Sequence, residues 1–180
     1  MKRIILCFSV ALLLFAHSVT TKGQRIAVKT NLLEWIVMSP NVGAEFVLGD
    51  KFSFDMGVAA GPFDFDKVKL RHFTLQPEFR FWTGRPMAGH YVGLTGFFSN
   101  YSTRFDKTSY SGDAFSIGAS YGYVFVLGER LNLETYIGVG YLKSRNCKFG
   151  KGEECPTEPN NVKQMVAPIR LGVTLSYIIK

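Results

Sequence analysis

The sequence predicts an all-β fold, specifically an eight-stranded antiparallel up-and-down transmembrane β-barrel with short periplasmic turns and longer extracellular loops. Apolar and polar residues alternate with a period of two in eight segments, and no helical period of any length is present. Several segments run to about ten residues or more, whereas strands of soluble proteins average about five to six. The apolar faces carry no Asp, Glu, Lys or Arg. A bilayer enforces this, because a charge at its midplane costs a barrel about 2–4 kcal/mol.

The N-terminus reads as a cleavable signal peptide over residues 1–18. Lys2 and Arg3 precede an apolar run over 4–15, which is too short to span a bilayer, and Ala16-His17-Ser18 fits a small-x-small cleavage site. The cut falls between 18 and 24. We therefore expect an exported barrel domain over 25–180, located in a cell outer membrane of the Gram-negative type.

Each of the eight expected strands has two different faces. One face is apolar, and the other is largely Gly, Ser, Thr and Ala with few charges. Small residues suit the crowded inside of a narrow closed barrel, whereas the water-facing surface of the rival, a secreted soluble barrel or sandwich, would be rich in Lys and Glu. The last strand is expected to place Met165, Ala167, Ile169 and Leu171 on the apolar face. In chain order the strands are 25–33, 41–48, 51–60, 72–82, 90–100, 114–127, 131–142 and 165–179.

The connections alternate in length. "LGDKF", "TGRPMAG" and "LGERL" are tight and glycine-centred, whereas the stretches around 33–40, 61–71, 101–112 and 144–162 are longer or more polar. This is the plan of an outer-membrane barrel. The related decapeptides "FVLGDKFSFD" (46–55) and "FVLGERLNLE" (125–134) are one turn device used twice, in which the glycine is expected to supply a positive φ.

Several charged residues fall on the face expected to line the barrel. Because an eight-stranded barrel is just wide enough for side chains to fill, and because buried charges must be paired, we interpret them as an interior ion network. The competing hypothesis is that paired carboxylates of this set are catalytic. The set is Lys29, Glu45, Asp55, Glu78, Arg80, Glu134 and Arg170.

The exported chain keeps two cysteines, Cys147 and Cys155, in a short polar segment. An oxidising compartment makes a disulfide between them the expected state. A metal site would need more ligands, and no histidine lies nearby.

No catalytic residues, metal, cofactor or nucleic-acid motif are expected, and the protein is predicted not to be an enzyme. A lipid-modifying site would need a nucleophile and a base near the membrane surface. His90 and Ser99 lie at opposite ends of one expected strand, so they are not partners, whereas His72 lies where it could face Ser99 on the next strand.

The segments "KTNLLEW" (29–35), "PNVGAEFVLGDKFSFD" (40–55), "QPEFRFW" (76–82) and "YGYVFVLGERLNLETYIGVGY" (121–141) resemble an uncharacterised family of small outer-membrane β-barrel proteins of Bacteroidota. The resemblance covers nearly the whole exported chain. It implies a barrel in the envelope and brings no catalytic residues. Relatives of this kind occur beside surface-fimbria genes, which implies an accessory role in surface assembly.

We therefore expect a non-enzymatic barrel with a structural or interaction role at the cell surface. Its partners would be the lipid bilayer, lipopolysaccharide, and a surface protein or polysaccharide that the extracellular loops contact. The net charge of +7 suits anionic headgroups or polysaccharide without specifying either. The alternatives are a lipid- or glycan-modifying enzyme with a rim site, and a narrow channel.

Overall fold

A computed structural model describes residues 25–65, 68–105, 108–150 and 161–179, so the expected signal peptide and Cys155 lie outside the described residues. The elements are β1 (Ile26–Asn31), α2 (Leu32–Ile36), β2 (Asn41–Val47), β3 (Phe52–Phe65), β4 (Val68–Trp82), β5 (Gly89–Phe105), β6 (Thr108–Val126), β7 (Leu131–Gly150) and β8 (Asn161–Ile178).

The strands form one closed barrel in which each pairs antiparallel with its neighbours in sequence, and β8 pairs with β1. The predicted fold class, an all-β eight-stranded antiparallel barrel, is confirmed. In the closing pair of β1 with β8, Ala27 lies opposite Ile178. If the paired residues are instead followed from Ala27 on β1 across β2 to β7, the partner reached on β8 is Ala167. This stagger means that the strands tilt relative to the barrel axis.

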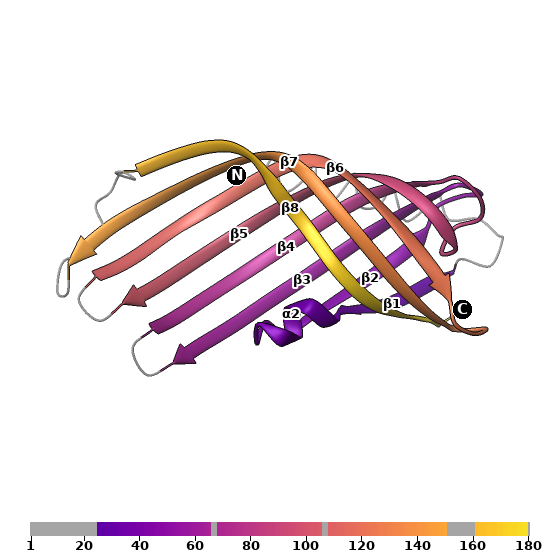
Figure 1. Ribbon diagram of the computed structural model, residues 1–180, viewed down its shortest axis with the longest axis horizontal. Helices are drawn as coiled ribbons and strands as arrows, with labels where there is room; N and C mark the ends of the chain where they lie inside the picture. The colour runs from indigo at the N-terminus through magenta and orange to yellow at the C-terminus, as the bar shows by residue number, and fades with distance from the viewer. Residues whose placement is uncertain (1–24, 66–67, 106–107, 151–160, 180) are drawn as a thin grey trace, which may run out of the picture.

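The two ends of the barrel differ. At one end, here the turn end, short connections join β2 to β3, β4 to β5 and β6 to β7. At the other, here the open end, β3 to β8 continue well past the short β1 and β2, with α2 beside them (Figure 1). The wall is therefore low at β1 and β2 and high elsewhere.

Two of the expected long loops are wrong, and the third, 144–162, is wrong at its two ends. The strand pairing of β3 with β4 continues to Phe65 and Val68, and that of β5 with β6 continues to Phe105 and Thr108, so 61–71 and 101–112 are long hairpins. β7 likewise runs on to Gly150. The alternation that marks a strand is absent from these segments, although backbone pairing continues through them.

The connection between β1 and β2 contains a short helix that the sequence did not reveal by periodicity, because α2 has only five residues. Its local signal was an N-cap residue followed three residues later by a glutamate. Asn31 Oδ1 accepts a hydrogen bond from Leu33 N at 3.1 Å, and Glu34 Oε1 accepts one from the Asn31 side chain at 3.0 Å. Among the described residues, no helix is long and apolar enough to cross a membrane.

The side chains are arranged with polar groups inside and apolar groups outside. Buried residues include seventeen polar or charged ones, while many large apolar residues of the outer face are exposed. Leu94 is 61% and Leu171 63% exposed. This is the reverse of a water-soluble protein.

In the part of β8 near the open end, Met165 and Ala167 were assigned to the wrong face of the strand. A bulge opposite Gly138 and Val139 takes Ile169 out of register, so Arg170 pairs with Gly138 while Pro168 pairs with Val139. Residues that lie directly opposite share a face. Met165 and Ala167 therefore lie opposite Leu142 and Gly140 on the side continuous with the interior. The bulge is invisible in the alternation because residues 165–169 are all apolar.

The two related turns have the same hydrogen bonds. Leu48 N and Gly49 N donate to Phe52 O, and Leu127 N and Gly128 N donate to Leu131 O. One device is thus used twice. The expected positive φ was wrong, since neither Gly49 nor Gly128 has one. The described residues with a positive φ are Met38, Met87 and Gly89.

Candidate functional site

The barrel interior carries three carboxylates side by side. Glu45 on β2 lies directly opposite Asp55 on β3, which lies directly opposite Glu78 on β4. Like charges in such positions repel one another. Glu134 on β7 adds a fourth carboxylate from across the interior, and all four are at most 3% exposed. Carboxylates buried so close together are stable only if neighbouring cations compensate their charge.

Arg80 is the central cation of this network. Its guanidinium lies 3.0 Å from Glu45 Oε2, 3.2 Å from Asp55 Oδ2, 2.5 Å from Glu78 Oε2 and 2.8 Å from Glu134 Oε1. It is fully buried. One planar fork with five donors is suited to joining several carboxylates in this way.

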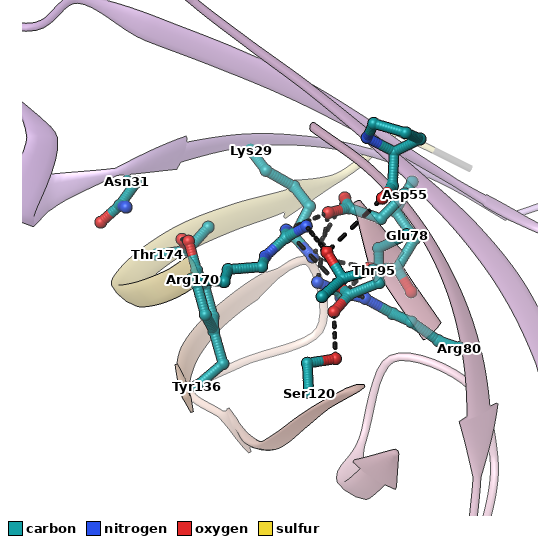
Figure 2. A network of polar contacts seen from close by, with 12 residues as sticks. Lys29, Asn31, Asp55, Glu78, Arg80, Thr95, Ser120, Tyr136, Arg170 and Thr174 are labelled. Carbon is teal, nitrogen blue, oxygen red and sulfur yellow. Dashed lines mark hydrogen bonds and ion pairs between the residues drawn. The ribbon is translucent and has the colours of Figure 1, made fainter. Parts of the chain in front are cut away.

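Two further cations complete the network (Figure 2). Lys29 Nζ lies 2.7 Å from Glu45 Oε2, 2.5 Å from Glu134 Oε2 and 3.5 Å from Asp55 Oδ1. Arg170 Nη2 lies 2.6 Å from Asp55 Oδ2. The structure thus places all seven residues of the expected interior set in one buried cluster.

Neutral hydroxyl groups donate further hydrogen bonds to the four carboxylates, which outnumber the three cations. Ser53 Oγ donates to Glu45 at 2.6 Å, Tyr91 Oη donates to Glu134 at 2.5 Å, and Ser120 Oγ donates to Glu78. The sequence analysis did not single out these residues. Their only signal was that each falls on the strand face expected to line the barrel.

Aromatic rings close the interior below the charges, towards the turn end. Trp82 and Tyr91 pack with their ring centroids 4.9 Å apart, and the Arg80 guanidinium lies 4.3 Å above Tyr91. A further ring, that of Tyr136, has its centroid 4.9 Å from Arg170 Cζ and lines the interior together with Asn31 and Glu34. A Cβ on Gly172 would stand 2.2 Å from this ring. Glycine is required there because the ring occupies the space.

The network leaves little free volume at mid-barrel. A cavity of about 30 Å³ touches Lys29, Asp55, Arg80 and Arg170, which is room for a water or two. Acid and base groups that are all engaged with one another are suited to filling the barrel. Within the described interior they do not face a space that a substrate could enter.

At the open end, two asparagines hold α2 and its loop on the barrel. Asn41 Oδ1 accepts from Asn31 N at 2.6 Å, and Asn41 Nδ2 donates to Asn31 O at 2.9 Å and to Ser39 O at 3.2 Å. Asn31 Nδ2 also donates to Glu34 Oε1 at 3.0 Å. Both asparagines belong to the motifs that carry the family resemblance, so those motifs build this rim.

The rim loop covers a hollow of about 370 Å³ against the inner faces of β3 and β4. Its lining is Glu34, Val37, Ser39, Ala59, His72, Thr74 and Gln76. Burial raises the pKa of the Glu34 carboxyl above its ordinary value, although the hydrogen bond from Asn31 and the charge of Arg170 oppose the rise. The sequence analysis missed this hollow.

The residues considered for a rim enzyme are not brought together as expected. His72 lies opposite Tyr101, and its Nε2 lies 2.8 Å from Ser39 Oγ. Ser99 Oγ is instead 2.8 Å from Thr74 Oγ1. His90 lies at the turn end, with its Nδ1 2.6 Å from Tyr121 Oη. His72 and Ser99 are therefore not hydrogen-bonded to each other, because His72 contacts Ser39 and Ser99 contacts Thr74.

Cys147 is buried on β7. Its expected disulfide partner lies outside the described residues, so the disulfide stays a prediction. No group of three or more His, Cys, Asp or Glu residues suited to a metal ion occurs in the described part of the chain.

A search of curated proteins finds no match to this chain. A family model described as "Protein of unknown function (DUF3575)" matches residues 9–179. The match covers nearly the whole sequence, including every strand, the interior charges and the rim. It supports the resemblance to an uncharacterised family, while the Bacteroidota origin and the fimbrial association stay predictions. The chain belongs to the DUF3575 family of proteins of unknown function.

Proposed function

We propose that this protein is a non-enzymatic outer-membrane β-barrel that is closed inside by its ion network and acts through its open end at the cell surface. The observation that carries the proposal is the reversed distribution of side chains, apolar outside and polar inside. The structural or interaction role follows from the filled interior and the tall open end.

The exposed apolar surface supports membrane insertion. Soluble monomers rarely expose apolar patches of more than a few hundred Å², and here large apolar side chains are exposed on every strand from β1 to β8. Closure pairs the strands all the way round, as lipid requires. The exposed residues include Val28, Val42, Phe46, Phe52, Phe79, Leu94, Phe115, Ile117, Ile137, Val139 and Leu171.

The two ends support an orientation. Bacterial barrels of this kind place short turns in the periplasm and longer segments outside. The turn end would therefore face the periplasm, and the hairpins of β3 to β8 would rise from the outer surface. These hairpins would meet lipopolysaccharide and a surface protein or polysaccharide. The family resemblance adds an accessory role in fimbria assembly.

Cell fractionation combined with heat-modifiable gel mobility tests the barrel and its location. We expect the protein in the outer-membrane fraction, with faster migration before boiling than after. Release as a soluble protein without detergent would contradict the whole proposal. A membrane-bound protein without a mobility shift would contradict the closed barrel alone.

Trimming the hairpin between β5 and β6 tests the interaction role. Removal of residues 102–111 shortens the open end without touching the charged network, and we expect loss of surface protein or polysaccharide from cells while the gel shift persists. A matched control shortens the turn-end segment 83–88. If cells with the trimmed hairpin keep a normal surface, the role does not lie in this hairpin.

A further inference from the structure

We propose that the hollow beneath α2 binds a neutral saccharide unit. This inference rests on the proposed function, because it places the open end at the cell exterior, where glycans are available. It deepens the proposed interaction role by naming a site and a ligand class.

The hollow has the size and position of a binding site. About 370 Å³ lies within the range of small-molecule pockets and suits one or two sugar rings. It is formed by α2 and its loop on one side and by β3 and β4 on the other, above the ion network. The closed barrel below gives it a floor.

The lining favours neutral groups over anions. Its surface is mostly apolar, and its polar groups are the Gln76 amide and the Ser39 and Thr74 hydroxyls. The two hydroxyls already bond His72 and Ser99, and each keeps a further hydrogen-bonding position for a ligand hydroxyl. Among the described lining residues there is no Lys or Arg, and Glu34 contributes a carboxylate. The nearest guanidinium in the cavity below, that of Arg170, is engaged with Asp55. A phosphate or carboxylate ligand would meet repulsion here without a compensating cation.

The wall of the hollow is held in place before any ligand arrives. Asn31 fixes Glu34 through Oε1, Asn41 fixes the carbonyl of Ser39, and Ser39 N donates to Glu34 O at 2.8 Å. Binding therefore does not need to order this loop, which preserves affinity. Local Asn contacts of this kind build a rigid rim.

The hydrogen bond between Ser39 and His72 fits binding better than nucleophilic catalysis. The other ring nitrogen of His72, Nδ1, is buried without a hydrogen-bond partner. An unpaired N–H costs more than an unpaired acceptor, which favours the tautomer in which Nε2–H donates to Ser39 Oγ. In that tautomer His72 does not accept the proton of Ser39, so it does not activate this hydroxyl as a nucleophile, and the Ser39 hydroxyl hydrogen remains available to a ligand.

A glycan microarray printed with neutral saccharides and their sialylated counterparts tests the inference, using the full exported chain folded in detergent. We expect binding to neutral saccharides in preference to sialylated ones. Gln76→Ala should weaken that binding about tenfold, because a ligand hydroxyl loses its partner. The matched control Gln164→Ala changes an amide on β8 outside the hollow and should leave binding unchanged.

Glu34→Gln tests the charge argument separately. The amide oxygen can keep the hydrogen bond from Asn31 while the negative charge is lost. The difference in binding between neutral and sialylated saccharides should therefore become smaller. Vesicles containing lactosylceramide, compared with free lactose as competitor, show whether the saccharide is lipid-borne or soluble.

Absence of any glycan binding, preference for anionic glycans, or equal binding by Gln76→Ala and the unaltered protein would each overturn the inference. Heat-modifiable mobility is measured on every preparation. A folded, membrane-inserted protein without glycan binding refutes the saccharide site and leaves the barrel proposal standing.

Discussion

Arg80 is the residue on which the interior depends most. It joins carboxylates from β2, β3, β4 and β7, and the cavity of about 30 Å³ that it lines is too small to solvate all of them. The stability of the network therefore comes from mutual compensation. Removal of one cation leaves carboxylates that are buried and repel one another.

We expect Arg80→Met to lower the free energy of unfolding by about 3–5 kcal/mol, measured by urea titration of the heat-modifiable band in lipid vesicles. Arg85→Met, in the exposed turn before β5, is the matched control and should shift it by less than about 0.5 kcal/mol.

Adding Glu134→Gln to Arg80→Met should recover part of the loss, because one uncompensated charge disappears with the cation. If Arg80→Met and Arg85→Met unfold at the same urea concentration, Arg80 does not hold the network together.

Gly172 is required for a different reason, namely the space its missing Cβ leaves for Tyr136. Gly172→Ala should destabilise the barrel by about 1–3 kcal/mol through overpacking. In the same urea titration Gly49→Ala should be close to neutral, since nothing lies within 4 Å of its Cβ position and its φ is not positive. Equal effects of the two substitutions would show that Tyr136 moves aside freely.

At the scale of elements, α2 and its loop have two different sides. Glu34, Val37 and Ser39 line the hollow. Trp35 and Ile36 lie on the other side and are 52% and 77% exposed. Trp35 Nε1 donates to Thr30 Oγ1 at 2.7 Å, which leaves the ring outside. An exposed tryptophan beside the apolar wall is typical of a membrane interface.

Tryptophan fluorescence tests this placement, because the chain has only two tryptophans. In vesicles with brominated lipids, Trp82→Phe leaves Trp35 as the sole reporter, and we expect strong quenching by bromines near the headgroups. Trp35→Phe leaves Trp82, which is 0% exposed inside the barrel and should be quenched less. If Trp35 is the less quenched of the two, α2 does not lie in the lipid interface.

The whole molecule is a barrel with a plug made of its own side chains. The mid-barrel cavity of about 30 Å³ is far smaller than an aqueous channel. We expect no ion conductance above background in planar bilayers that contain folded protein, with a 16-stranded porin as positive control. Steady single-channel steps from the unaltered protein would contradict the plugged interior.

Much of the fold could be predicted from sequence because alternation is a local signal. It assigns Glu45 and Asp55 to one face and Phe46 and Phe54 to the other, and a barrel interior forces such charges to pair. Prediction failed where the local signal is absent. It is absent from the long hairpins and at the bulge near Ile169, where every neighbour is apolar. It is also absent from α2, whose five residues are too few to show a helical repeat.

The sequence by itself determined the class of the fold, the inner and outer faces of most strands, the repeated turn and the charged residues of the interior, since each depends on neighbours along the chain. Only the tertiary structure decided which charges meet and where the rim hollow lies. Strand register and tilt bring Glu134 to Arg80, and the pairing of β2 with β3 and of β3 with β4 brings His72 to Ser39. Such pairings depend on the geometry of the closed barrel, which no single stretch of sequence contains.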